Sequence, residues 1–116
     1  MDTHPEIEVS LEREVTDAGP ILCAKVSAPT WELNVRAESA AFLRLGEIRA
    51  TYWAGRSTLQ VGRSAGAPAH WWCERDRVTV ALGQGDDTWD LAMEMPVAVV
   101  DDLVAQVAAL AAGSEV

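Results

Sequence analysis

Residues 62–66 read G-R-S-A-G, which matches the G-x-S-x-G pattern around the serine nucleophile of many hydrolases. In those enzymes the serine lies on a tight turn between a strand and a helix, and the histidine comes last in the chain order. Here an expected strand follows Ser64, and the only later histidine, His70, precedes every acidic residue after that serine. We therefore interpret residues 62–68 as a glycine-rich loop and predict no catalytic residue.

The carboxylates Asp86, Asp87, Asp90 and Glu94 form the second group that could do chemistry. Calcium loops place oxygen ligands at alternating positions around a glycine bend and end on a glutamate, a spacing that is absent here. Paired carboxylates also hydrolyse glycosides, but a short chain offers little room for a sugar cleft. Neither histidine has a partner at metal-ligand spacing. The sequence predicts no metal site and no cofactor, and we interpret Asp86 and Asp87 as part of a solvated turn.

Tryptophan is the most unusual residue type in the chain, with five copies beside one Phe and one Tyr. Trp71 and Trp72 are adjacent in an expected strand, so their side chains must lie on opposite faces. An exposed tryptophan near arginine is typical of a protein-binding hot spot, and it also stacks on sugars or flat ligands. We expect most of the five to pack in the core and at least one to serve a binding surface.

The formal net charge is −9, and a negative surface repels phosphate backbones, which disfavours nucleic acid as a partner. Residues 78–116 hold seven acidic residues and no Lys or Arg, whereas residues 39–77 hold six arginines and three acidic residues. An acidic half attracts basic partners and accelerates their encounter. The plain alternative is that the charge only keeps the protein in solution.

Cysteine usage and hydropathy favour a cytoplasmic protein. Cys23 and Cys73 show no metal or redox spacing, so we expect reduced, packed thiols, with a disulfide between neighbouring strands as the alternative. No apolar run is long enough to span a membrane, and the first residues lack the pattern of a secretory signal. One lysine against eight arginines, with abundant alanine, is typical of a GC-rich bacterial genome.

Alternation of apolar and polar residues predicts an antiparallel sheet. In the last expected strand, Trp89, Leu91, Met93 and Met95 should share one face. Residues 1–5 are expected to form a disordered lead-in. The expected strands cover residues 6–12, 21–28, 31–36, 59–61, 71–73, 77–82 and 88–95.

Two helices complete the prediction. Ser39 suits the N-cap of an internal helix over about residues 39–53, which has a weak point at Gly46. Pro96 suits the first turn of a second helix over about residues 96–111, which has an apolar stripe at helical spacing. The sequence thus predicts a single α+β domain over residues 1–116, in which both helices pack on a sheet of six to seven antiparallel strands.

These observations favour a non-enzymatic, acidic protein-binding domain. The most concrete version is an immunity- or antitoxin-type inhibitor that sequesters a basic protein. In that interpretation acidic side chains supply charge pairing and a tryptophan supplies the anchor. The candidate partner-binding residues are Trp71, Trp72, Asp86, Asp87, Asp90 and Glu94.

Two alternatives remain open. The first is a small-ligand-binding or minor enzymatic domain with a pocket between sheet and helix, lined by Trp31, Trp72 and His70. The second is a homo-oligomeric structural module, such as a homodimer paired through a strand edge.

Overall fold

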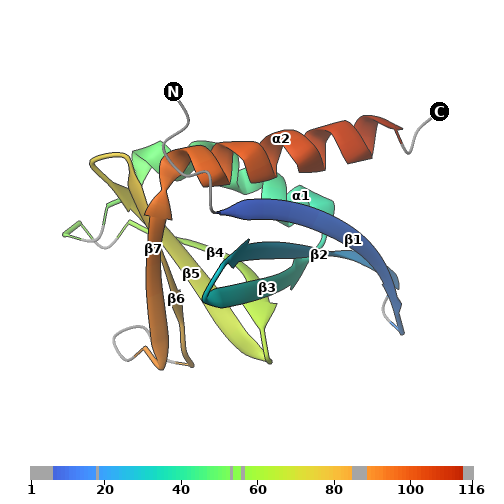
Figure 1. Ribbon diagram of the computed structural model, residues 1–116, viewed down its shortest axis with the longest axis horizontal. Helices are drawn as coiled ribbons and strands as arrows, with labels where there is room; N and C mark the ends of the chain where they lie inside the picture. Colours follow the sequence, from blue (N-terminus) through green and yellow to red (C-terminus); the bar gives the residue numbers. More distant parts are fainter. Residues whose placement is uncertain (1–6, 18, 53, 56, 85–88, 114–116) are drawn as a thin grey trace.

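The protein forms one antiparallel sheet of seven strands with two helical segments packed on it, so the predicted α+β architecture is confirmed (Figure 1). The computed structural model describes residues 7–17, 19–52, 54–55, 57–84 and 89–113, with side chains as far as Leu110. Each strand pairs with its neighbours in the chain. The strands are β1 (Glu8–Thr16), β2 (Gly19–Ala28), β3 (Trp31–Ala37), β4 (Leu59–Ser64), β5 (Ala67–Glu74), β6 (Arg77–Leu82) and β7 (Leu91–Pro96).

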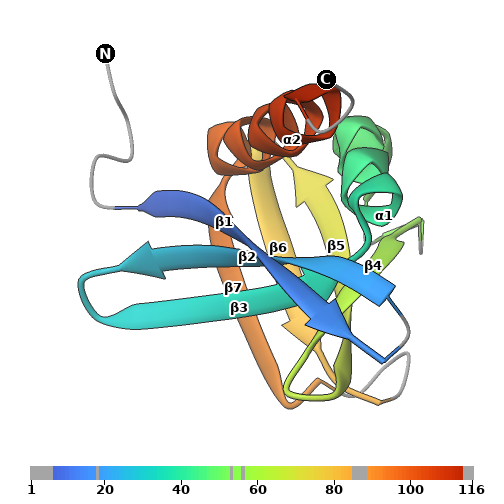
Figure 2. The ribbon, with the colours of Figure 1, turned by 90° about the vertical axis from the view of Figure 1, so that its right-hand side faces the viewer.

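The sheet bends sharply between β3 and β4, so that β1–β3 run crosswise over β5–β7 (Figure 2). β3 and β4 share a single registered pair, Arg36 with Arg63, and β4 carries a bulge between Gln60 and Arg63. Gly62 lies in that bulge with a φ of 78°, and a Cβ there would lie 2.5 Å from Cγ1 of Val35. Bulges and glycines let a sheet turn a corner, and here the close approach of β3 requires the glycine.

The segment that matches the nucleophile pattern is a β-hairpin turn. β4 continues through Ser64 and β5 begins at Ala67, so the predicted loop over residues 62–68 was wrong. Ala65 and Gly66 form the two-residue connection with φ values of 53° and 82°. Two-residue hairpin turns of type I′ have positive φ at both central residues. Alanine rarely adopts that conformation, so the local sequence did not reveal the turn.

The internal helix is shorter and less regular than predicted. It consists of α1 (Ser39–Leu43) followed by a 3₁₀ helix, η1 (Arg44–Ala50). Glu47 departs from helical backbone angles next to the predicted weak point at Gly46. The helix therefore ends at Ala50 instead of residue 53. Its N-cap is Glu38, with no side-chain cap hydrogen bond, so the assignment of Ser39 as the N-cap was also wrong.

Helix α2 (Val97–Gly113) lies across one end of the folded sheet and packs on α1, η1, β1, β6 and β7 (Figure 1). Val100, Leu103 and Val107 are buried, so the predicted apolar stripe faces the core. Pro96 is the last residue of β7 instead of the first of the helix. β7 is an edge strand, where a residue without an N–H group costs the sheet least. Among the described residues, no helix is long and apolar enough to cross a membrane.

Candidate protein-binding surface

Three aromatic rings lie on the side of β5 and β6 that faces away from the core. Along β5, Trp71 and Cys73 face the core, whereas His70 and Trp72 face the other side. The ring of Trp89, which lies just before β7, is centred 4.9 Å from the ring of His70 and 6.1 Å from that of Trp72. All three side chains are half-buried. We call His70, Trp72 and Trp89 the aromatic cluster.

The position of Trp89 corrects the prediction that it shares a face with Leu91 and the two methionines that follow. β7 begins only at Leu91, and the chain before it brings Trp89 to the outer face. Ala81 pairs with His70 across the sheet and also points outward, yet it is fully buried. Side chains of this outer layer therefore cover the sheet at that point.

Of the two adjacent tryptophans, the structure places only Trp72 where a partner can reach it. Trp71 is 0% exposed, and its Nε1 donates a hydrogen bond to the carbonyl oxygen of Val61 at 3.0 Å. A buried indole with its N–H satisfied is a core residue. Trp71 therefore does not belong to the candidate surface.

The predicted acidic residues are only partly brought together. Asp90 is exposed beside Trp89, and Glu94 points from β7 to the same outer face. Arg77 on β6 donates to Oε1 of Glu94 at 3.2 Å, so the charge of this carboxylate is partly compensated. Asp86 and Asp87 lie outside the described residues.

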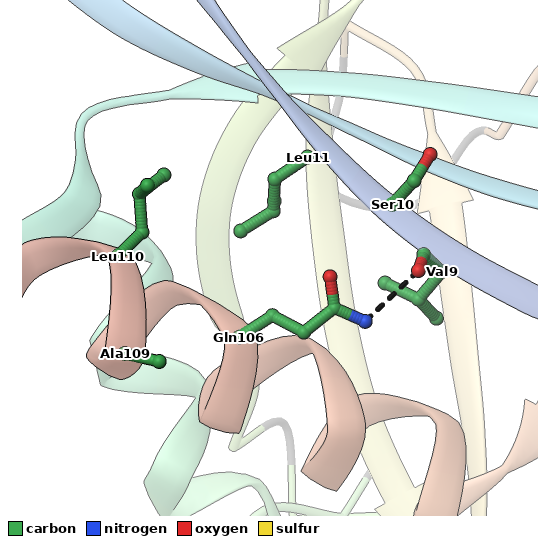
Figure 3. Close-up of a pocket in the computed structure, with 6 residues that line it drawn as sticks. All are labelled: Val9, Ser10, Leu11, Gln106, Ala109 and Leu110. Atoms are coloured by element: carbon green, nitrogen blue, oxygen red, sulfur yellow. Dashed lines mark hydrogen bonds between the residues drawn. The ribbon is translucent and has the colours of Figure 1, made fainter. Parts of the chain in front are cut away.

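The pocket expected between sheet and helix does not have the predicted lining. Trp31 packs against the core on the inner side of β3, whereas His70 and Trp72 lie on the outer side of β5, so these three cannot line one cavity. A different groove, of about 550 Å³, opens between β1 and α2 (Figure 3). The groove was missed because its walls are ordinary apolar residues from opposite ends of the chain. Its lining residues are Val9, Ser10, Leu11, Gln106, Ala109 and Leu110.

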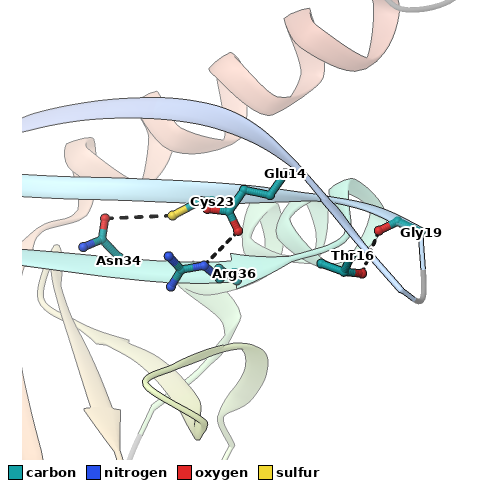
Figure 4. Close-up of polar contacts among 6 residues, drawn as sticks. All are labelled: Glu14, Thr16, Gly19, Cys23, Asn34 and Arg36. Atoms are coloured by element: carbon teal, nitrogen blue, oxygen red, sulfur yellow. Dashed lines mark hydrogen bonds and ion pairs between the residues drawn. The ribbon is translucent and has the colours of Figure 1, made fainter.

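The outer face of β1–β3 carries a second polar surface (Figure 4). Arg36 Nε donates to Oε1 of Glu14 at 2.9 Å, which joins β3 to β1 across β2. Cys23 lies on the same face, and its Sγ is 3.9 Å from Oδ1 of Asn34.

Both thiols are free and buried, as predicted, and they sit on the non-adjacent strands β2 and β5. Desolvation raises the pKa of Cys23 and of Cys73, so neither forms a ready thiolate at neutral pH. Within the described ranges, no three His, Cys, Asp or Glu side chains are grouped so that they could hold a metal ion.

Comparison with known proteins finds no matching family, no matching curated protein and no matching solved structure.

Proposed function

We propose that the protein is a non-enzymatic protein-binding domain whose aromatic cluster docks a basic protein partner. The observation that carries the proposal is a group of three half-buried rings on the outer side of a sheet whose inner side already holds a full core around Trp71. Tryptophan is enriched at the energetic centres of protein interfaces because it buries a large rigid surface at low entropic cost. Trp72 is the anchor in this proposal.

Charge defines the partner. Asp90 follows Trp89 in the chain, and Glu94 lies on the same outer face, two strands away from Trp72. Carboxylates at the rim of an interface steer a positively charged partner and fix its orientation. Among the described residues 78–110, Glu94 and Asp101 form ion pairs with arginines, whereas Asp90 and Asp102 form none. The remaining negative charge therefore favours a partner that presents Lys or Arg around an apolar contact.

The concrete form of the proposal is an immunity- or antitoxin-type inhibitor that sequesters a basic toxin in a bacterial cytoplasm. The charge balance of the chain supports it, with 18 acidic and nine basic residues. The two free thiols support a location in a reducing compartment, because small domains in oxidising compartments commonly form disulfides.

The test is affinity capture of the partner from native lysate with tagged wild type, two charge-reversed variants and Trp72→Ala. Glu94→Lys changes the candidate surface. Glu32→Lys makes the same change at an exposed glutamate of β3, in the layer of the sheet formed by β1–β3. We expect wild type and Glu32→Lys to retain one basic protein that elutes as salt rises, whereas Glu94→Lys and Trp72→Ala lose most of it.

Melting temperatures of all variants serve as the folding control. Equal losses for the two lysine variants would mean that only net charge matters, and full retention by Trp72→Ala would remove the aromatic cluster from the interface.

A further inference from the structure

The backbone of β1 offers hydrogen-bonding groups to a further strand. Among the strands of the described chain, β1 lies at the edge of the sheet and pairs only with β2. The carbonyl oxygen of Val9 accepts a hydrogen bond from Nε2 of Gln106 at 2.9 Å, so it points away from β2 (Figure 3). In an antiparallel strand, alternate residues direct their N–H and C=O to the same side. The backbone groups of Leu11, Arg13 and Val15 therefore also point away from β2.

On the core-facing side of this edge lies the groove between β1 and α2. Val9 and Leu11 form one wall, and Ala109 and Leu110 form the other. Figure 3 shows Leu11 and Leu110 projecting into the space between strand and helix. Successive side chains of a strand alternate between faces, so a strand added beside β1 would direct every second side chain into this apolar groove.

The other side of β1 is acidic. Glu8, Glu12 and Glu14 project from its outer face, and only Glu14 has an ion-pair partner among the described residues, Arg36. A second copy of the chain, paired β1 to β1, would bring like-charged glutamates side by side, which destabilises a sheet. The charges therefore disfavour a homodimer through this edge and favour a strand with basic residues on that face.

We propose that the β1 edge binds an extended segment of a partner protein in which apolar residues alternate with lysine or arginine. The segment adds to the sheet beside β1, its apolar side chains enter the groove, and its basic side chains lie next to Glu8 and Glu12. Main-chain hydrogen bonds supply affinity in such strand addition, and the groove supplies specificity. Gln106 holds the carbonyl of Val9 until the incoming N–H replaces it. The exposure of Val15, 88%, leaves the far end of the edge open.

The test uses a synthetic peptide of about six residues, a common strand length, with alternating Lys and Val. A peptide with the lysines and valines in two blocks has the same charge and composition and serves as its control. We expect the alternating peptide alone to bind at low salt, and to slow exchange of the outward amide protons of Leu11 and Arg13. Equal binding of both peptides, or unchanged exchange at those amides, would overturn the proposal.

Two variants at one position separate backbone from side chain. Arg13→Pro removes an outward N–H that β2 does not use, and Arg13→Ala keeps it. We expect the proline variant to bind the alternating peptide roughly tenfold more weakly, since a main-chain hydrogen bond is lost and the ring obstructs the edge. The alanine variant should bind nearly as wild type does. Peptide binding that survives Arg13→Pro in a folded variant would contradict strand addition.

This inference does not rest on the aromatic cluster, which lies on β5–β7. Trp72→Ala should leave peptide binding at β1 unchanged, and Arg13→Pro should leave capture through the aromatic cluster unchanged. The two proposals therefore fail separately. The alternative occupant of the β1 edge is a second copy of the chain, and sedimentation of the free protein tests for it. If wild type forms a dimer that Arg13→Pro dissociates, the edge binds a second copy and not a partner segment.

Discussion

Trp71 and Trp72 are neighbours in the chain but have different roles: Trp71 stabilises the core, and Trp72 belongs to the aromatic cluster. Trp71 is enclosed by the core and satisfies the carbonyl of Val61, whereas Trp72 is half-buried in the aromatic cluster. Trp71→Phe leaves that carbonyl without its donor and opens a cavity, so we expect a loss of about 2–4 kcal/mol in the free energy of unfolding.

Trp72→Phe is the matched control, and we expect it to cost less than about 1 kcal/mol, in the range of substitutions at partly exposed sites. Urea unfolding followed by circular dichroism measures both. Similar losses for the two variants would contradict the division between core and surface.

Glycine is required at position 62, where the sheet bends between the layer of β1–β3 and the layer of β5–β7. Gly62 and Gly66 both have positive φ, but only a Cβ at Gly62 would collide with neighbours, 2.5 Å from Val35 Cγ1 and 2.9 Å from the carbonyl oxygen of Arg36. Gly66→Ala should cost about 1–2 kcal/mol, the penalty for the left-handed conformation alone. Gly62→Ala should cost clearly more, because β3 must also move.

Urea unfolding of these two alanine variants isolates the steric part of the penalty. If they were equally stable, the close approach of β3 and β4 would not be the reason for Gly62.

At the scale of elements, one ion pair joins the internal helix to α2. Arg49 at the end of η1 donates two hydrogen bonds of 2.8 Å to the carboxylate of Asp101. The guanidinium of Arg49 lowers the pKa of Asp101 below its ordinary value of 3.8. A carboxyl whose pKa is lower in the folded state than in the unfolded state stabilises the fold at any pH above its unfolded-state pKa. That stability is lost as the pH falls through the folded-state pKa.

Asp101→Asn should therefore destabilise the protein at pH 7 but match wild type in acid well below pH 3.8. Both side chains of the pair are about half exposed, 56% and 47%, so solvent screening holds the expected difference below about 1 kcal/mol. Thermal unfolding across this pH range measures the difference. Asp102→Asn is the control, because Asp102 is exposed and forms no ion pair within the described chain. A difference that persists unchanged in acid would mean that Asp101 acts by something other than its charge.

Local patterns predicted the elements that local contacts decide. Strict alternation over residues 77–82 located β6, and the apolar stripe located α2. The errors lie where distant contacts decide. The internal helix ends early because the hydroxyl of Thr51 donates to Ile48 and accepts the backbone N–H of Cys73 on β5. The sequence of the helix itself does not reveal this contact with β5.

The candidate surfaces were predictable only in part for the same reason. Adjacent positions in a strand required Trp71 and Trp72 to face opposite sides, but the sequence could not say which side was the core. Trp89 reaches the outer face because its ring packs on His70, a contact made between strands. The groove depends on Val9 and Gln106, which are 97 residues apart and meet only when α2 returns to β1.

At the scale of the whole molecule, the two layers of the sheet are held together by few strand contacts. One registered pair joins β3 to β4, and α2 bridges β1 to β6 and β7. Val26, Leu33 and Val35 on the inner faces of β2 and β3 belong to the same buried cluster as Trp71. We nevertheless predict that β1–β3 opens locally more often than β5–β7, because so few registered pairs join β3 to β4. Local openings of this kind require less free energy than global unfolding.

The two buried thiols report on the two layers separately. Cys23 on β2 lies between Glu12 and Arg36 of the neighbouring strands, and Cys73 on β5 faces the core. Burial raises the pKa of both thiols, so alkylation in the folded state needs an opening. With Cys23→Ser and Cys73→Ser as single-thiol variants, we expect iodoacetamide to label Cys23 faster than Cys73, with a weaker dependence on urea.

Glu14→Gln tests the cause of that difference. It removes the ion pair of 2.9 Å that joins β1 to β3 beside Cys23, without touching the layer that holds Cys73. We expect labelling of Cys23 to accelerate and labelling of Cys73 to stay unchanged, as mass spectrometry would show. If both thiols instead react at one rate with one urea dependence, the two layers open together. The β1 edge would then be as rigid as the core, and binding of a further strand there would meet a preformed site instead of a mobile one.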